Sequence, residues 1–163
     1  MAFMALAWEA SARQAPRAGQ SFPVRFAVDG DTLDIGGAGR VRLLGIDSPE
    51  LGRGFDTPAP FAREARDRLA SLAVARYVRL EFEPGTADAY GRLLAYVIRE
   101  DGVVLNVEMV RAGLARVSAR QALRRLPELR RAEEDAQRSR RGIWGDRPSI
   151  PDRVFRVPRP ASR

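Results

Sequence analysis

Two turns divide residues 22–46 into three segments with the composition of β-strands. Asp29-Gly30 is a strong hairpin signal, and the run Gly36-Gly37-Ala38-Gly39 makes the second break. We therefore predict strands over residues 22–28, 32–35 and 40–46. Because strands joined this closely pair antiparallel in chain order, this part of the chain is restricted to a three-stranded meander.

Side chains in the third predicted strand alternate between the two faces of the sheet. Val41, Leu43 and Gly45 share one face, and Arg42, Leu44 and Ile46 share the other. An arginine on a face that is otherwise apolar lies either at a sheet edge or in the wall of a pocket.

The rest of the chain adds two further strands and three helices. Thr57-Pro58 is predicted to begin a helix that runs to about residue 75, because threonine is a good N-cap and proline suits the first helical position. Strands follow over residues 77–83 and 91–99, and helices over 103–112 and 126–141. This order predicts an α+β fold, a five-stranded OB-type Greek-key β-barrel with three helices.

Composition divides the chain into three parts. Residues 1–20 form a leader, either a degraded signal peptide or a disordered segment. Residues 21–146 form the globular domain, and residues 147–163 a basic tail, rich in proline and arginine, that is predicted to be disordered. No run approaches the roughly 18 apolar residues of a membrane span.

Residue types absent from the chain exclude several kinds of chemistry. All 28 basic residues are arginines, and there is no lysine, histidine or cysteine. Catalysis by an imidazole, a lysine amine or a thiolate is therefore excluded, and acid or base work falls to carboxylates, tyrosine, water or a metal. The net charge of +7 favours a polyanionic partner, although residues 21–150 contribute only 22 arginines against 19 acidic residues.

Four carboxylates gather at the ends of the first three predicted strands. Asp29 and Asp31 follow the first strand, Asp47 and Glu50 follow the third, and Arg42 lies between the two pairs. Taken separately, these segments are typical of a turn and of a strand end leading to a helix cap. Together they predict a hard, oxygen-rich site for calcium or magnesium at one rim of the sheet, beside a phosphate.

Over residues 22–146 the chain resembles the staphylococcal-nuclease-like (thermonuclease) family. The resemblance rests on five motifs in the same order: Asp29-Gly30-Asp31-Thr32, the segment Val41-Arg42-Leu43-Leu44-Gly45-Ile46-Asp47-Ser48-Pro49-Glu50, the segment Asp88-Ala89-Tyr90-Gly91-Arg92-Leu93-Leu94-Ala95-Tyr96, residues 105–115, and Gly142-Ile143-Trp144.

The resemblance implies a role for each matching residue. Asp31, Asp47 and the backbone carbonyl of Ser48 match the calcium ligands. Arg42 and Arg92 match the arginines that hold the scissile phosphate, and Glu50 matches the residue that positions or deprotonates the attacking water. Asp29 matches an acidic residue behind the metal. Asp88 and Tyr90 precede Arg92 in the same loop, where Tyr90 either lies near the phosphate or packs against the barrel.

The implied function is a calcium-dependent endonuclease that hydrolyses DNA and RNA with little sequence specificity and leaves 3′-phosphate ends. We expect a monomer that prefers single strands and, with the alanine-rich leader, an exported bacterial protein. One alternative is a non-catalytic OB-fold module that binds single-stranded nucleic acid, which would be favoured by loss of a carboxylate or arginine of the site. Another is a protein-binding domain, which would be favoured by an apolar rim.

Two departures from the family affect the substrate side. Residues 118–121 read Ser-Ala-Arg-Gln where the archetype has tyrosines that contact the nucleotide, and Ala89 replaces a lysine. Arg120, Arg124 and Arg125 are either compensating phosphate contacts or a solvated helix face. Base stacking is the property that these departures are expected to alter.

Overall fold

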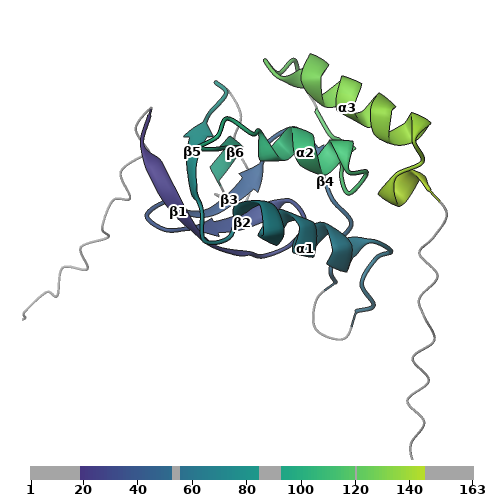
Figure 1. The fold of residues 1–163 in the computed structure, drawn as a ribbon, viewed down its shortest axis with the longest axis horizontal. Helices are drawn as coiled ribbons and strands as arrows, with labels where there is room; N and C mark the ends of the chain where they lie inside the picture. The colour runs from purple at the N-terminus through teal and green to yellow at the C-terminus, as the bar shows by residue number, and fades with distance from the viewer. Residues whose placement is uncertain (1–18, 53–55, 85–92, 120, 146–163) are drawn as a thin grey trace, which may run out of the picture.

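The computed structural model describes residues 19–52, 56–84, 93–119 and 121–145 (Figure 1). Its centre is a closed barrel with the strand order β1-β2-β3-β6-β5. The strands are β1 (Ser21–Ala27), β2 (Thr32–Ile35), β3 (Gly39–Leu43), β5 (Tyr77–Glu81) and β6 (Leu93–Arg99). The predicted α+β fold with a five-stranded OB-type barrel and three helices is confirmed.

The first three strands form the expected antiparallel meander. Phe26 pairs with Asp34 across β1 and β2, and Asp34 pairs with Arg40 across β2 and β3. Alternate positions point into the barrel, where Leu33 and Val41 are fully buried. The even-numbered side chains of β2 and β3 consequently lie on the outside of the barrel, Arg42 among them.

Two long-range pairings close the barrel. β6 runs parallel to β3, with Leu94 opposite Arg42, and β5 runs antiparallel to both β6 and β1. A second, two-stranded sheet pairs β4 (Ile46–Asp47) with β7 (Arg116–Val117). This small sheet attaches the segment after β3 to the segment after α2.

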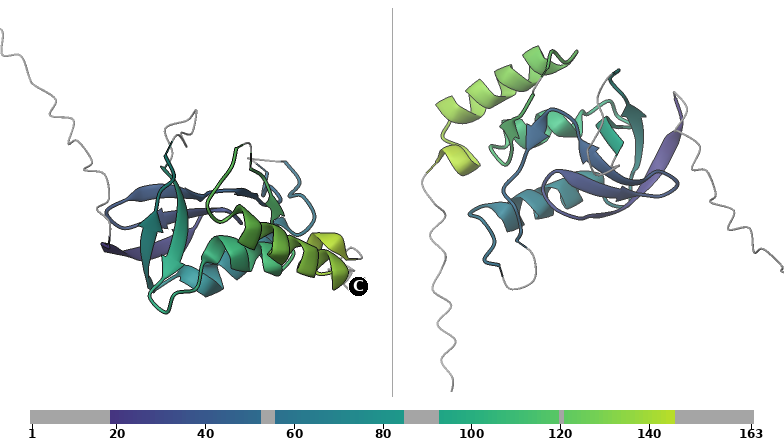
Figure 2. Two further views of the ribbon diagram at one scale, coloured as in Figure 1. Left: turned by 90° about the horizontal axis from the view of Figure 1, so that it is seen from above. Right: turned by 180° about the vertical axis from the view of Figure 1, so that it is seen from behind.

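The helices gather on one side of the barrel (Figure 2). α1 (Ala62–Ala73) packs against β1 and α2 (Leu105–Arg111), and α2 packs against α3 (Leu126–Arg138). A 3₁₀ turn, η1 (Gly142–Trp144), follows α3. Among the described residues, no helix has the length and apolar character needed to cross a membrane.

The predicted third strand over residues 40–46 is wrong in one respect, because it is two strands rather than one. β3 ends at Leu43, the chain turns through Leu44 and Gly45, and β4 begins at Ile46. Gly45 has a φ of +80°, and a Cβ there would lie 2.9 Å from Leu123 Cδ1. Only glycine suits this turn. Because of the turn, Leu44 and Ile46 do not share a strand face with Arg42, as the predicted single strand required.

The predicted start of the first helix is also wrong. α1 begins at Ala62, and Phe61 at its N-cap is in the left-handed region with φ of 69° and no side-chain cap. Thr57 and Pro58 instead lie in the preceding loop, where Ala59 N donates a 2.9 Å hydrogen bond to Glu50 O. Because residues 57–59 belong to this loop, the helix begins after the Thr57-Pro58 signal and not at it.

Candidate active site

Arg42 joins two of the predicted metal ligands at the barrel rim. Its Nη1 donates to Asp31 Oδ1 and its Nη2 donates to Asp47 Oδ1, each over 2.6 Å. Asp31 comes from the loop between β1 and β2, whereas Asp47 comes from β4. The fold therefore brings together the carboxylates that the sequence placed sixteen residues apart, with one guanidinium shared between them.

The loop that carries Asp31 is fixed from both sides. Asp31 N donates a 2.9 Å hydrogen bond to Asp29 Oδ1, which makes Asp29 a turn residue that supports the ligand loop. A Cβ on Gly30 would lie 2.5 Å from Ala65 Cβ and 2.8 Å from Ser48 Oγ. Only a residue without a side chain allows the loop to approach both α1 and Ser48 this closely.

Asp31 is nearly completely buried, with 2% of its surface exposed. Thr32 Oγ1 donates to its Oδ1 over 2.9 Å, and Ser48 N donates to its Oδ2 over 3.2 Å. Burial raises the pKa of the Asp31 carboxyl to about 7, a rise that Arg42 opposes and the Asp29 carboxylate reinforces. Additional positive charge beside this group would favour its ionised form.

The charge of Arg42 is reinforced by its surroundings. Burial acts to lower the pKa of the Arg42 guanidinium, but Asp31 and Asp47 outweigh that effect and raise it above its ordinary value. Arg42 is therefore a permanent cation held by two carboxyl groups at the edge of solvent, since Asp47 is 57% exposed.

The donor set fits a hard cation. Asp31 and Asp47 offer carboxylate oxygens, and together with the backbone carbonyl of Ser48 they would form the protein part of a calcium site. That one guanidinium contacts an oxygen of each carboxyl group shows that these oxygens converge on a cation. The described residues contain no cluster of three or more acidic, histidine or cysteine side chains.

The other predicted site residues differ in how the structure places them. The Ser48 side chain is buried, and its backbone N–H contacts Asp31. Glu50 is exposed at the start of the next loop, and within the described part of the chain its carboxylate forms no hydrogen bond or ion pair. Arg92, Asp88 and Tyr90 lie outside the described residues.

Asn106 was missed as a site-supporting residue. This fully buried amide donates from Nδ2 to Leu44 O over 2.9 Å and to Ala95 O over 3.2 Å, and its Oδ1 accepts from Val97 N over 3.0 Å. It thereby links α2 to β6 and to the turn between Arg42 and Asp47. A lone asparagine within the apolar run Val104-Leu105-Asn106-Val107 was the available signal.

Arg116 is a second residue that the sequence did not single out. It stands opposite Asp47 in the pairing of β4 with β7, and its guanidinium lies 4.7 Å from the centre of the Trp144 ring. Trp144 thus helps to order a cation beside the acidic rim.

Arg124 and Arg125 have a structural placement that neither sequence alternative anticipated. Arg124 contacts Glu83, and Arg125 is shared between Glu81 and Glu128. These ion pairs attach the segment before α3 to β5 and to the residues just after it. Arg120 lies outside the described residues.

The barrel order and the acidic rim crossed by an arginine define an OB-type α+β domain with a candidate phosphodiester site. A family model described as "Staphylococcal nuclease homologue" matches residues 40–146, and the chain belongs to that family. The resemblance found in the sequence is thereby confirmed.

Relatives cover most of the chain. A thermonuclease of Staphylococcus intermedius is 35% identical over 132 residues, 77% of this chain and 77% of the relative. The SPbeta prophage-derived endonuclease YokF of Bacillus subtilis (strain 168) is 33% identical over 135 residues, 79% of this chain and 45% of that longer protein. An uncharacterized endonuclease of Escherichia coli O157:H7 is 32% identical over 132 residues, 79% of this chain and 80% of the relative.

Proposed function

We propose that this protein is a calcium-dependent endonuclease that hydrolyses phosphodiester bonds of DNA and RNA with little sequence specificity and leaves 3′-phosphate ends. Its family and its endonuclease relatives support a hydrolytic nuclease. The observation that carries the proposal is the guanidinium of Arg42, held 2.6 Å from both Asp31 and Asp47. Fixed positive charge beside a cation-binding carboxylate pair suits the electrostatics of phosphodiester cleavage.

Asp31, Asp47 and the Ser48 carbonyl are proposed to hold the calcium ion. The ion would supply positive charge beside the phosphate and a polarised water. With calcium bound to the two carboxylates, Arg42 would donate its N–H groups to the non-bridging phosphate oxygens instead, with Arg92 as the second arginine. Because a guanidinium stays protonated at any working pH, this phosphate grip does not titrate.

Glu50 is proposed to orient or deprotonate the attacking water. The chain has no histidine, and the Glu50 carboxylate is exposed and without a partner among the described residues. It is therefore available to accept a hydrogen bond from a water at the rim. Asp29 would support the metal loop, and Asp88 and Tyr90 would contact the substrate side.

We further propose that the enzyme acts as a monomer and prefers single strands. An unpaired strand exposes its phosphates and base faces together, which suits a rim with arginines. Export from a bacterial cell stays a prediction from the leader sequence.

A cleavage assay with matched variants tests the function. The purified full chain is incubated with end-labelled single-stranded DNA, duplex DNA and RNA, in calcium or in EDTA. We expect cleavage only when calcium is present. The cleavage rate should fall about a hundredfold or more in Arg42→Ala and in Glu50→Ala. Arg79→Ala is the control, because Arg79 is an exposed arginine of β5 that forms no ion pair with other described residues.

The ends of the products test the position of the cut. Products with 3′-phosphates have free 5′-hydroxyl groups, so polynucleotide kinase should label them without prior phosphatase treatment. Full activity in EDTA would contradict the metal assignment. Binding without cleavage under any divalent cation would instead favour the single-strand binding module.

A further inference from the structure

The outer face of the meander extends away from the candidate active site. Thr32 pairs with Arg42, and two residues further from the rim Asp34 pairs with Arg40 and with Phe26. Because Leu33 and Val41 between them are buried inside the barrel, Phe26, Asp34, Arg40 and Arg42 project from the same outer surface. We refer to Phe26, Asp34 and Arg40 as the outer row.

Phe26 is unusual in its exposure. It is 49% exposed, and among the described residues only Tyr77, at 52%, is another large hydrophobic residue exposed to this degree. Because half of the Phe26 surface faces solvent, the ring offers a flat surface on which a base can stack. Arg25 precedes Phe26 in β1, and Arg40 lies one strand beyond Asp34, so positive charge stands on both sides of Asp34.

The charges of the outer row are arranged unequally. Arg40 is exposed and forms no hydrogen bond or ion pair within the described part of the chain. Arg25 is also exposed, whereas the Asp34 side chain is only 18% exposed, and the two ionised groups lie 3.5 Å apart. The cations therefore face solvent while the anion is withdrawn between them, which favours an anionic ligand over a cationic one.

We propose that the outer row binds the nucleic acid strand next to the cleaved phosphate, with Arg40 on the adjacent phosphate and Phe26 stacked on a base. The proposal rests on the proposed function, since it extends the same site. Arg40 and Arg42 are separated by two residues of one strand, about 6.7 Å. That step is comparable with the separation of successive phosphates in an extended single strand.

Residues 118–121 lack the tyrosines that contact the nucleotide in the family's archetype. A base-stacking surface on Phe26 supplies from β1 what that segment lacks. The strand would then leave the rim along β3 and cross toward β1, a direction set by the register of Asp34 with Arg40 and Phe26.

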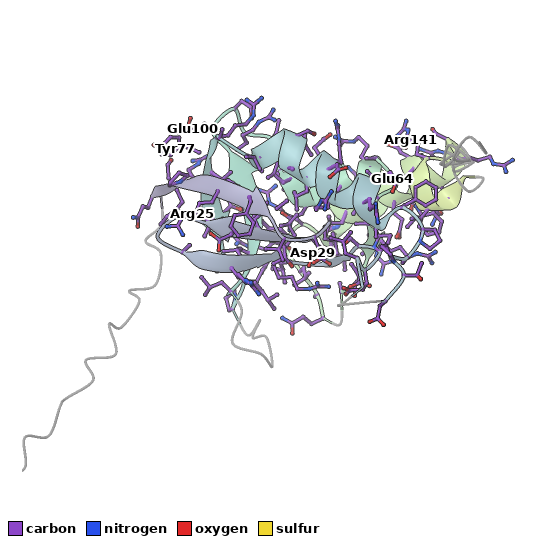
Figure 3. All side chains as sticks on the ribbon, turned by 90° about the horizontal axis from the view of Figure 1, so that it is seen from below. Arg25, Asp29, Glu64, Tyr77, Glu100 and Arg141 are labelled. Carbon is purple, nitrogen blue, oxygen red and sulfur yellow. The ribbon has the colours of Figure 1, made fainter. Side chains whose placement is uncertain are left out.

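Binding of a fluorescent single strand tests the outer row separately from catalysis. The probe is an oligothymidylate of about 12 nucleotides, within the ~4–16 nucleotide site sizes of OB folds. Anisotropy is measured for the full chain in EDTA, and a gel checks that the probe stays intact. Phe26→Leu should weaken binding about tenfold, and Phe26→Trp should retain it. Tyr77→Ala is the matched control, because Tyr77 is the other exposed large hydrophobic residue and is labelled well away from Asp29 of the rim (Figure 3).

The charged members of the row have their own signatures. Arg40→Ala should reduce the slope of log affinity against log salt by about 0.7, the value for one phosphate contact on a single strand. Asp34→Asn should tighten binding severalfold at low salt, a gain that damage to the fold would not produce. Phe26→Leu should leave the salt slope unchanged.

The outcomes separate this inference from the nuclease proposal. If Phe26→Leu and Arg40→Ala bind like the unmodified protein while that protein cleaves DNA, the outer row is wrong and the nuclease assignment stands. If the chain binds and the variants weaken as expected but nothing is cleaved, the outer row stands without the nuclease. If Tyr77→Ala weakens binding of the probe as much as Phe26→Leu does, the outer row is also wrong.

Discussion

Asn106 joins three backbone segments through one fully buried side chain, and none of its hydrogen bonds goes to a residue of the site itself. Its partners belong to β6 and to the turn after Arg42. By holding Leu44 O, this buried amide fixes the turn between Arg42 and Asp47 and so affects the acidic rim indirectly. The partner at Leu44 is 62 residues away, which is why a local sequence pattern could not reveal the bond.

Asn106→Leu should destabilise the fold by about 3 kcal/mol, because it leaves the Val97 N–H and the Leu44 and Ala95 carbonyls buried without their partner. Urea denaturation followed by circular dichroism measures this loss. Met109→Leu, a volume-conserving change at another fully buried position of α2, is the control and should cost less than about 1.5 kcal/mol. Equal losses in the two variants would show that Asn106 contributes only volume.

The sequence alone predicts the site where chemistry and chain position agree. It indicates that Asp31, Asp47 and Arg42 share one rim, because turns and strand ends are local features, and the structure brings them together. It could not show that Arg42 is shared between the carboxylates, nor that Asp31 is almost wholly buried, because both depend on packing from α1 and β4.

At the scale of elements, the small sheet of β4 and β7 determines where Asp47 stands. Asp47 pairs with Arg116, and the next residue of β7, Val117, donates a 2.8 Å hydrogen bond to Glu133 Oε1 of α3. Helix α3 therefore holds β7, which in turn holds the strand of Asp47, a proposed metal ligand. The alternation of residues 40–46 concealed this arrangement, because Gly45 breaks the strand without interrupting the apolar pattern.

Glu133→Ala should lower the cleavage rate about tenfold or more without touching the site, since small displacements of reacting groups are costly. Glu133→Gln retains a side-chain oxygen that can accept from Val117 N, and it should keep most of the activity. Rates in the calcium-dependent assay measure both variants. Equal loss in Glu133→Gln and Glu133→Ala would mean that the hydrogen bond does not carry the effect.

At the scale of the whole molecule, a calcium site would link metal binding to the stability of the fold. The proposed ligands come from segments that only the folded barrel brings together, so calcium would bind the native state in preference to the unfolded chain. A ligand present at about 100 times its Kd stabilises the native state by about 2.7 kcal/mol.

Saturating calcium should therefore raise the Tm of the protein by about 5–10 °C. Asp31→Asn should abolish that increase, because it removes the charge of the buried ligand. Differential scanning fluorimetry with calcium or EDTA measures the change, with Asp67→Asn as the control, since Asp67 is an exposed carboxylate of α1. An undiminished calcium effect in Asp31→Asn would place the metal elsewhere.

Barrel closure also governs the order in which this chain can complete its structure. β1 contributes one edge to β2 and the other to β5, with Ser21 opposite Arg79, while β3 waits for β6. During synthesis, the meander therefore emerges with both outer edges unpaired until β5 has been made, and the β3 edge stays unpaired until residue 99 has been made. Such edges are templates for pairing with other chains, so the vulnerable interval of this protein is the growth of the nascent chain from β3 to β6.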